Sequence, residues 1–300
     1  MSTSSISPLI DRLTVIGVGL IGGSVASALK ARGLVGHVVG CARSAQTLDL
    51  AMERGLIDSS TTHVGEAASN ADVVLLATPV GTMRNLLPQV GEALQTGAVV
   101  TDAGSTKQRV VDIARDVLAD RFEDFVPGHP VAGSESSGPA AACSDLFLDH
   151  WTVLTPTAET NSASIQKVTQ LWEQIGSKIK IMEADTHDRV LGMTSHLPHI
   201  VAYALVSQLA QQVDQDDCLA LAAGGFFDIT RVAGSDPVMW RDICLDNKEV
   251  TVELINAYQT ILEQIKKSVS ETDGESLEGL FKAAKLLRNR LETIKIESKH

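Results

Sequence analysis

The sequence predicts an α/β domain with a parallel sheet, followed by an all-α domain. Short apolar runs alternate with helical patterns through the first half of the chain, which is typical of a parallel sheet covered by helices. From Thr186 onward the strand pattern stops and only helical periodicity remains. A length of 300 residues suits two domains. We expect them at residues 12–184 and 185–300.

Seven short runs are the predicted strands. Five of them form the expected parallel sheet, at Leu13–Gly17, Val38–Cys41, Asp72–Thr78, Ala98–Asp102 and Phe125–Pro127. The third and fourth runs are almost continuously apolar, as expected of strands that are buried on both faces. Trp151–Thr155 and Lys178–Met182 are expected to add two edge strands.

Helical periodicity predicts three helices in the first domain and four in the second. They are expected at Ser24–Arg32, Met83–Leu94, Gln108–Leu118, Asp188–Gln212, Cys218–Ala222, Pro237–Ile261 and Leu277–Ile294. Pro198 should kink its helix or lie in the first turn. The long amphipathic helices of the second domain either form a dimer interface or pack only on one another, and the sequence supports both interpretations.

Composition and charge exclude several function classes. Lys and Arg number 25 against 37 Asp and Glu, which gives a net charge of −12, so the chain is a poor binder of nucleic acid and of anionic membranes. No uninterrupted apolar run reaches the ~18–20 residues of a membrane span. The four cysteines form no CxxC pair, and the amino terminus lacks the pattern of a signal peptide. We expect a cytoplasmic protein with a small-molecule substrate.

A glycine-rich segment follows the first predicted strand and precedes the first helix. Gly17-Val-Gly-Leu-Ile-Gly22 matches G-x-G-x-x-G, which in this context is typical of a Rossmann-type dinucleotide site. The three glycines allow a tight turn, a close approach to the pyrophosphate and close helix packing. The candidate cofactor-binding residues are Gly17, Gly19, Leu20, Ile21, Gly22, Arg43, Ser44, Thr78 and Pro79.

The end of the second predicted strand bears on the choice of cofactor. NAD sites usually place an acidic residue there to bind the ribose hydroxyls, whereas this chain has Ala42, Arg43 and Ser44. Arg43 can pair with a 2′-phosphate, and Ser44 can donate a hydrogen bond to it. The pattern favours NADP among the NAD(P) cofactors. The alternative is that Arg43 is an ordinary solvated residue and that NAD binds without the carboxylate.

Two catalytic candidates follow predicted strands at their carboxyl ends, where doubly wound sheets bind ligands. His129 lies between Gly128 and Pro130, which predicts a constrained loop, and an imidazole suits proton transfer near neutral pH. Ser105 and Gln108 form an S-x-x-Q capping box, so Ser105 is expected to cap the next helix. That role is compatible with a place in the active site.

The second half offers three further candidates. His196 and His199 are three residues apart on one helical face, but no matching ligand set accompanies them, so we expect no metal site. Arg231 follows Gly224-Gly225, a pair that can break a helix and direct side chains toward a cleft. The alternative for Arg231 is a surface arginine.

Five segments together resemble a known family. GVGLIGGS, DAGSTK, GHPVAGSESSG, SHLPH and GGFFDITRVAGSDPVMWRDI occur in this order, and the chain is similar through them to the TyrA family of prephenate and arogenate dehydrogenases. The resemblance implies a Rossmann-type domain and a helical dimerisation domain that forms a homodimer. It also implies an NAD(P)-dependent oxidative decarboxylation of prephenate to 4-hydroxyphenylpyruvate, or of arogenate to tyrosine, in tyrosine biosynthesis.

The resemblance also implies roles for individual residues. His129 is expected to accept the proton of the ring hydroxyl, and Ser105 to orient that histidine and contact substrate or nicotinamide. Arg231 is expected to bind a substrate carboxylate, which suits a guanidinium fork. The remaining expected substrate-site residues are His199, Glu135, His196 and Trp240.

Two alternatives remain beside this function. One is another NADP-dependent dehydrogenase with a helical second domain, such as a β-hydroxyacid dehydrogenase or a pyrroline-carboxylate reductase. The GHPVAG and SHLPH segments speak against it. The other is a dinucleotide-binding dimer without turnover, which the variant His129→Asn would distinguish from an enzyme.

Overall fold

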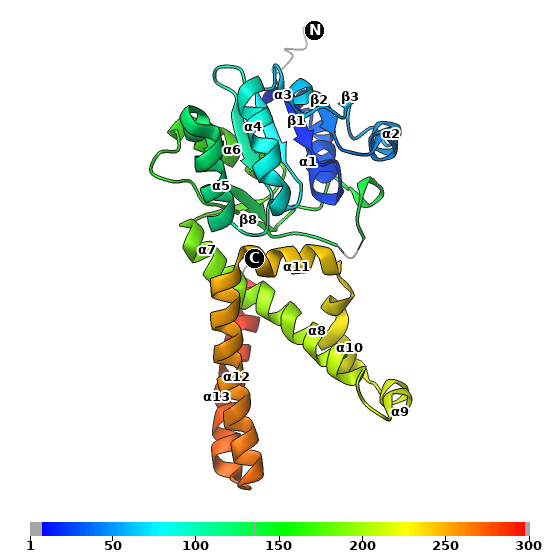
Figure 1. The fold of residues 1–300 in the computed structure, drawn as a ribbon, viewed down its shortest axis with the longest axis vertical. Helices are drawn as coiled ribbons and strands as arrows, with labels where there is room; N and C mark the ends of the chain where they lie inside the picture. The colour runs from blue at the N-terminus through cyan, green and yellow to red at the C-terminus, as the bar shows by residue number, and fades with distance from the viewer. Residues whose placement is uncertain (1–7, 135, 298–300) are drawn as a thin grey trace. The chain divides into compact units, whose positions relative to one another are not determined.

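The computed structural model describes residues 8–134 and 136–297. The chain divides into two compact units, Met1–Lys248 and Glu249–His300, and each is described by itself. The first unit contains both sheets and the helices up to α11 (Figure 1). All residues of the candidate site that the structure describes lie in this first unit.

A six-stranded parallel sheet forms the centre of the first unit, in the order β3-β2-β1-β4-β5-β6. This is the order of the doubly wound dinucleotide-binding fold, so the predicted fold class is confirmed. The strands are β1 Ile10–Ile16, β2 Val35–Cys41, β3 Ser59–Thr61, β4 Val73–Leu76, β5 Val99–Asp102 and β6 Phe125–Val126. The sequence prediction missed the short β3.

Helices cover both faces of this sheet. The predicted helices at 83–94 and 108–118 are present almost as expected, whereas α2, α3 and α6 were not predicted. The bounds are α1 Leu20–Ala31, α2 Ala45–Glu53, α3 Val64–Ala68, α4 Met83–Ala93, α5 Gln108–Leu118 and α6 Ser162–Gln174. Short 3-10 helices lie at η1 Val80–Thr82, η2 Ala119–Asp124 and η3 Pro139–Ala141.

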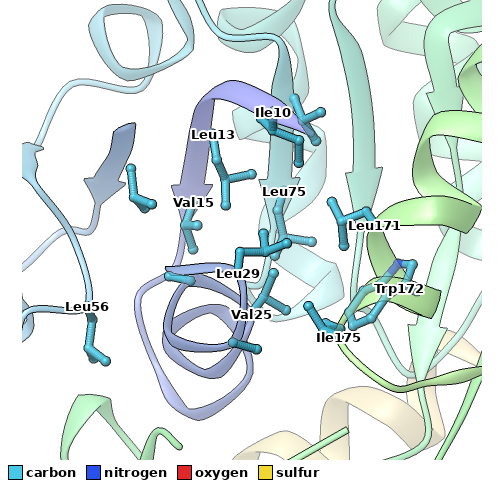
Figure 2. Packing of buried hydrophobic residues seen from close by; sticks show 14 of the residues in the cluster. Ile10, Leu13, Val15, Val25, Leu29, Leu56, Leu75, Leu171, Trp172 and Ile175 are labelled. Atoms are coloured by element: carbon cyan, nitrogen blue, oxygen red, sulfur yellow. The ribbon is translucent and has the colours of Figure 1, made fainter. Parts of the chain in front are cut away.

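One hydrophobic core lies between the sheet and helices α1 and α6. Leu13 and Val15 of β1 and Leu75 of β4 pack there with Leu29 of α1 and Trp172 of α6 (Figure 2). All five side chains are fully buried. Because successive strand residues point to opposite faces, the alternate positions of the same strands supply a second core.

The second core lies between the other face of the sheet and helices α3, α4 and α5. Leu76 of β4 packs there with Met83 and Leu87 of α4 and Val110 of α5. Strands buried on both faces explain why the central runs are apolar throughout. The two cores together fix the carboxyl edge of the sheet, where the candidate site lies.

The runs predicted as edge strands form a separate sheet, so that prediction was wrong. Strands β7 Gly128–Pro130, β8 Trp151–Leu154 and β9 Lys178–Ile181 pair in this order, with β7 antiparallel to β8. Pro127 separates β6 from β7, and a proline has no N–H with which to continue the ladder of the main sheet. The chain therefore leaves that sheet after two residues of β6.

The helical part of the first unit begins with one continuous helical segment. It comprises α7 Ala184–Leu191, a π-helical turn η4 Gly192–His196 and α8 Leu197–Leu209. Pro198 lies in the first turn of α8, one of the two places predicted for it, directly after the π-helical turn. The segment is followed by α9 Gln215–Ala220, α10 Gly224–Thr230, η5 Arg231–Gly234 and α11 Pro237–Asp246.

The segment Ala184–Leu209 has the length and mean hydropathy, 1.2, of a membrane-spanning helix. A single helix of this kind is also typical of soluble cores and interfaces. Its buried side holds His187, Asp188 and His196, which form hydrogen bonds within the first unit. The length and hydropathy of this segment therefore do not by themselves indicate a membrane.

The second unit contains most of the last two helices, α12 Lys248–Ser270 and α13 Gly274–Glu297. The prediction of one helix over 237–261 was wrong, because Asn247 ends α11 and α12 starts after it. Asn247 is buried and its side chain donates a hydrogen bond to the carbonyl of Asp188 at 2.9 Å. This tertiary contact accompanies the break in the helix.

Candidate active site

A pocket of about 380 Å³ lies at the carboxyl ends of β1, β2 and β4. Among the residues lining it are six of the nine predicted cofactor residues: Gly17, Gly19, Arg43, Ser44, Thr78 and Pro79. Leu20, Ile21 and Gly22 lie outside the lining. Doubly wound sheets bind dinucleotides at this edge. The structure thus brings the glycine segment after β1 and the ends of β2 and β4, the strands on either side of β1, together around one cavity.

The glycine segment forms a close-packed turn in which positions 17 and 22 have no room for a larger residue. Gly17 has a φ of +98°, and a Cβ atom there would lie 2.5 Å from the carbonyl oxygen of Ala77. A Cβ atom on Gly22 would meet the carbonyl oxygen of Gly17. Gly19 has open space where its Cβ atom would be, which leaves room for a ligand against the backbone. These features fit a bound pyrophosphate.

Helix α1 begins at Leu20, four residues before the predicted Ser24. Gly19 occupies the N-cap position and has no side chain to accept hydrogen bonds from the first turn. The free N–H groups of a helix start, together with its dipole, attract phosphate groups. Leu20 and Ile21 can contribute through these backbone groups even though they do not line the pocket.

The end of β2 supplies the only charge in the described pocket lining, at Arg43. Arg43 and Ser44 are both exposed. The Ser44 hydroxyl accepts a hydrogen bond from the Thr47 amide at 3.4 Å and so caps α2, a role that the sequence analysis did not assign. The described lining holds no carboxylate that would bind ribose hydroxyls.

His129 lies in strand β7, opposite Val153 of β8, so the prediction of a loop was wrong. Its Nδ1 atom is 2.8 Å from Nε2 of His187 in α7. The Nδ1 atom of His187 is in turn 2.8 Å from Oδ1 of Asp188. The two imidazole rings meet edge to face, with centroids 5.0 Å apart. A strand holds His129 more firmly than a loop would, and a chain of hydrogen bonds fixes its ring.

Asp188 also caps helix α5. Its carboxylate accepts hydrogen bonds from the amides of Lys107 at 2.8 Å and Gln108 at 2.9 Å. The prediction that Ser105 caps this helix was wrong, because the N-cap position is Lys107 and Ser105 lies two residues before it. A carboxylate from α7 takes the place of the serine hydroxyl, and its bonds to amides are charge-assisted.

A fully buried ion pair supports the strand that carries His129. Lys107 Nζ donates to the carboxylate of Asp102 and to the carbonyl of Gly128, the latter at 2.7 Å. Asp102 also accepts the amide protons of Gly104 at 2.7 Å and Gly128 at 3.0 Å. Burial lowers the pKa of Lys107, and the Asp102 carboxylate opposes this shift. The added hydrogen bonds offset the desolvation of the two charges.

Burial keeps His129 neutral near pH 7. Its pKa lies well below the ordinary 6.5, first because the side chain is desolvated and then because His187, Lys107 and His196 face it. The pKa of His187 is also lowered by burial, while its hydrogen bond to Asp188 opposes the shift. A neutral imidazole has a lone pair to accept a proton, as a general base requires.

The helical part supplies a second group of side chains. His199 stacks on Trp240, with ring centroids 3.6 Å apart and an angle of 20° between the planes. His196 meets the same tryptophan edge to face at 6.1 Å. Burial lowers the pKa of His196 to about 4. Burial also lowers the pKa of His199; the hydrogen bond to the Ser195 carbonyl opposes this shift, and the charge of Arg231 adds to it.

The structure places the predicted catalytic and substrate-binding residues in three different ways. His196 and His199 both contact the Trp240 ring, His196 also helps to lower the pKa of His129, and Arg231 lies at the start of η5. Ser105 lies half-buried between β5 and α5, but the hydrogen-bond partner of His129 is His187. Glu135 lies outside the described residues. Among the described residues, no group of three or more His, Cys, Asp or Glu side chains could hold a metal ion.

Sequence reasoning missed the residues that support His129. Lys107 and Asp102 both lie in the DAGSTK segment, where a carboxylate and an ammonium five residues apart at a strand end were a usable signal. His187 and Asp188 form an adjacent pair where the helical half begins. Their role depends on the approach of α7 to β7, which no local pattern indicates.

Comparison with known proteins supports the same assignment of the two halves. Residues 25–181 match the family model described as "Prephenate dehydrogenase, nucleotide-binding domain", and residues 183–283 match "Prephenate dehydrogenase, dimerization domain". The cyclohexadienyl dehydrogenase of Zymomonas mobilis is 35% identical over 283 residues, which cover 94% of this chain and 96% of that protein. The prephenate dehydrogenase of Bacillus subtilis is 36% identical, over 94% of this chain and 76% of that protein.

A solved structure has the same fold. The crystal structure of prephenate dehydrogenase from A. aeolicus, in complex with hydroxyphenyl propionate and NAD+, superposes with a TM-score of 0.88 at 34% identity. The match covers 96% of this chain and 100% of that chain. The family models, the relatives and the fold agree, and the chain belongs to the prephenate dehydrogenase family.

Proposed function

We propose that the protein catalyses the oxidative decarboxylation of prephenate to 4-hydroxyphenylpyruvate, with arogenate, which would give tyrosine, as the alternative substrate. The observation that supports this most is the state of His129. The ring is neutral, its Nδ1 atom is engaged by His187, and its Nε2 atom remains for a substrate hydroxyl. This is the group that the oxidation of a ring alcohol requires.

The glycine turn and the pocket beside it would hold NAD(P)+. The pyrophosphate would lie against Gly19 and the start of α1, and the adenosine ribose near Arg43 and Ser44. Thr78 and Pro79 line the same pocket at the end of β4. When bound, the nicotinamide supplies the acceptor for the hydride that leaves C4 of the substrate ring.

His129 performs the proton transfer. Its Nε2 atom accepts the proton of the C4 hydroxyl as the C–H bond breaks, so that the C4–O bond becomes a carbonyl. The C–C bond to the ring carboxylate then breaks, carbon dioxide leaves, and its electron pair makes the ring aromatic. The phenolate oxygen takes the proton back from His129. The products are 4-hydroxyphenylpyruvate, carbon dioxide and the reduced cofactor.

The substrate carries two carboxylates, which need a local positive charge in this acidic protein. We assign Arg231 to one of them, because a guanidinium binds a carboxylate through two parallel hydrogen bonds. The His199 ring is stacked on Trp240, and the charge of Arg231 helps to lower its pKa, so we assign His199 to the same substrate-binding group. The remaining proposed substrate contacts are Ser105, Glu135 and His196.

The cofactor is proposed to be NADP in preference to NAD. Arg43 is the one charged residue in the described pocket lining, and an arginine at the end of β2 suits the 2′-phosphate. The runner-up is NAD with its ribose bound by backbone and hydroxyl groups. A direct comparison of the two cofactors decides between them.

The helical half is proposed to form a homodimer. Large apolar side chains are exposed on it in the first unit, among them Met193, Phe227, Ile229 and Leu245. Exposed apolar surface of this kind favours an interface over helices that pack only on one another. We also propose that the two domains divide at residues 184 and 185, and the limits of the matched family regions, 25–181 and 183–283, support this division. The four free thiols suit a reducing cytoplasm.

Initial rates of cofactor reduction test the proposed reaction. Prephenate and arogenate are each supplied with NADP+ and with NAD+, and His129→Asn is measured beside the native protein. We expect turnover with prephenate and its loss in the variant, with cofactor binding retained. Silence with both substrates, in a protein that binds the cofactor, would favour the non-catalytic dimer instead. Turnover of a β-hydroxyacid or a pyrroline carboxylate would favour the other dehydrogenases.

A further inference from the structure

We infer that His187 and Asp188 are positioning residues that hold His129 in a single tautomer, with its proton on Nδ1 and its lone pair on Nε2. The inference rests on the proposed function, because Nε2 of His129 is the atom that receives the substrate proton. It goes beyond that function by naming the residues that prepare the base.

The assignment starts at the Asp188 carboxylate, which can only accept hydrogen bonds. Its Oδ1 atom accepts from the Lys107 amide and its Oδ2 atom from the Gln108 amide, so the carboxylate is held in place by the backbone at the start of α5. The Nδ1 atom of His187 lies 2.8 Å from Oδ1. That short contact requires His187 to carry its proton on Nδ1.

The second step passes from His187 to His129. Because burial lowers the pKa of His187, the ring has one proton, and Nδ1 holds it. Its Nε2 atom is therefore an acceptor, and the Nδ1 atom of His129 lies 2.8 Å away. One proton must lie between these two nitrogens, and His129 must donate it. A neutral His129 then has its lone pair on Nε2.

The groups around the pair support this arrangement from several elements. His129, on β7, is faced by His187 on α7, by Lys107 before α5 and by His196 in η4. His187 is faced by Asp188 and Asp102, which favour its charged form, and by Lys107, which opposes it. When His129 takes a proton from the substrate, its Nδ1–H donates more strongly to His187, whose own proton is bonded to Asp188. The carboxylate thus stabilises the imidazolium through one intervening ring.

The same carboxylate also fixes the other side of the site. By capping α5, Asp188 sets where the loop after β5 ends, and that loop carries Ser105. The Asn247 side chain donates to the Asp188 carbonyl at 2.9 Å and lies 3.2 Å from His196. Asp188 therefore connects three segments that hold proposed catalytic or substrate-binding residues.

The tautomer can be observed without any substrate. The protein is labelled with ¹⁵N-histidine, and the ring nitrogens of His129 are assigned by comparison with the His129→Asn variant. We expect a protonated Nδ1 and an unprotonated Nε2 at pH 7.5. The opposite tautomer, or rapid exchange between the two, would overturn the inference. Because this readout needs no turnover, it stands even if prephenate proves not to be the substrate.

Two substitutions of His187 then test the effect on the reaction. His187→Asn keeps a donor for Asp188 but removes the acceptor for His129, whereas the carbonyl of His187→Gln can replace that acceptor. In the full-length protein with prephenate, we expect the Asn variant to lower kcat by ~10²-fold or more, within the range of general base catalysis, at nearly unchanged KM. We expect the kcat of the Gln variant to be at least about tenfold higher than that of the Asn variant.

His150→Asn is the matched control, since His150 is exposed and its Nδ1 atom lies 2.9 Å from the Leu148 carbonyl oxygen. We expect it to leave kcat unchanged. Cofactor binding and circular dichroism test whether each His187 variant folds. If one does not, the ¹⁵N-histidine spectrum of the native protein decides which tautomer His129 has. An unchanged kcat in His187→Asn, or no recovery in His187→Gln, would overturn the role assigned to His187.

Discussion

The Asp188 carboxylate accepts the amide proton of Lys107 at 2.8 Å, although the two residues are 81 positions apart in the chain. The contact joins the first helix of the helical half to the start of α5 in the sheet domain. It takes the place that the sequence pattern gave to Ser105. A single side chain thus links the stability of the fold to the geometry of the proposed base.

Replacing the Asp188 carboxylate should lower the free energy of unfolding. In Asp188→Asn the side-chain NH₂ group takes the place of one carboxylate oxygen and so points at an N–H donor. The hydrogen bonds to the other oxygen lose their charge assistance. A hydrogen bond to a charged group is worth ~1.5–3 kcal/mol, so we expect the free energy of unfolding to fall by about 2 kcal/mol. Urea denaturation measures it. Asp185→Asn, an exposed residue paired with Arg189, should change it by under ~1 kcal/mol.

The features that the sequence predicted are the ones encoded locally. The apolar runs of β1, β4 and β5 and the glycine segment after β1 each depend on a few adjacent residues, and the structure has them where expected. The prediction of Ser105 as a cap failed because a distant carboxylate competes for the same amides. His187 was missed because its role arises only when α7 folds against β7, which brings together residues far apart in the sequence.

Removing one partner of the buried Lys107–Asp102 ion pair should strongly lower the free energy of unfolding. Lys107→Met leaves the Asp102 carboxylate buried with no cation, and such losses cost ~3–5 kcal/mol. Chemical denaturation should show a decrease of that size. The double variant Asp102→Asn with Lys107→Met should recover part of it, because no uncompensated charge remains. Lys30→Met, at the half-exposed pair with Asp58, should cost ~1 kcal/mol or less, and an equal loss there would contradict the argument.

The pH profile of kcat/KM should have its acid limb at an unusually low pH, because that limb reports the pKa of His129. A protonated His129 cannot accept the hydroxyl proton, so activity is present above its pKa and is lost as pH falls through it. Because burial, His187, Lys107 and His196 hold that pKa well below 6.5, kcat/KM for prephenate should stay level from pH 7.5 to below 6.5. A limb at or above pH 6.5 would show that the base titrates normally.

Arg231 should contribute mainly to substrate affinity. Arg231→Ala removes the proposed partner of a carboxylate that is ionised in both substrate and product. A charge-assisted bond is worth ~1.5–3 kcal/mol, so we expect KM for prephenate to rise about 10- to 100-fold with a smaller fall in kcat. Steady-state kinetics measure both. Arg189→Ala, an exposed arginine paired with Asp185, is the control and should leave KM unchanged. An unchanged KM in Arg231→Ala would remove Arg231 from the proposed site.

Arg43 should set the ratio between the two cofactors. Arg43→Asp replaces a cation that can bind a 2′-phosphate with a carboxylate that repels it and can accept from ribose hydroxyls. We expect the ratio of kcat/KM for NADP+ to that for NAD+ to fall by at least about tenfold, the equivalent of one charge-assisted bond. Arg43→Ala removes the cation without adding the acceptor, so it should weaken NADP+ and leave NAD+ nearly unaffected. The pocket lining explains why one residue has this effect, since Arg43 is its only described charge. If both variants keep the native ratio, the 2′-phosphate is bound elsewhere or the cofactor is NAD.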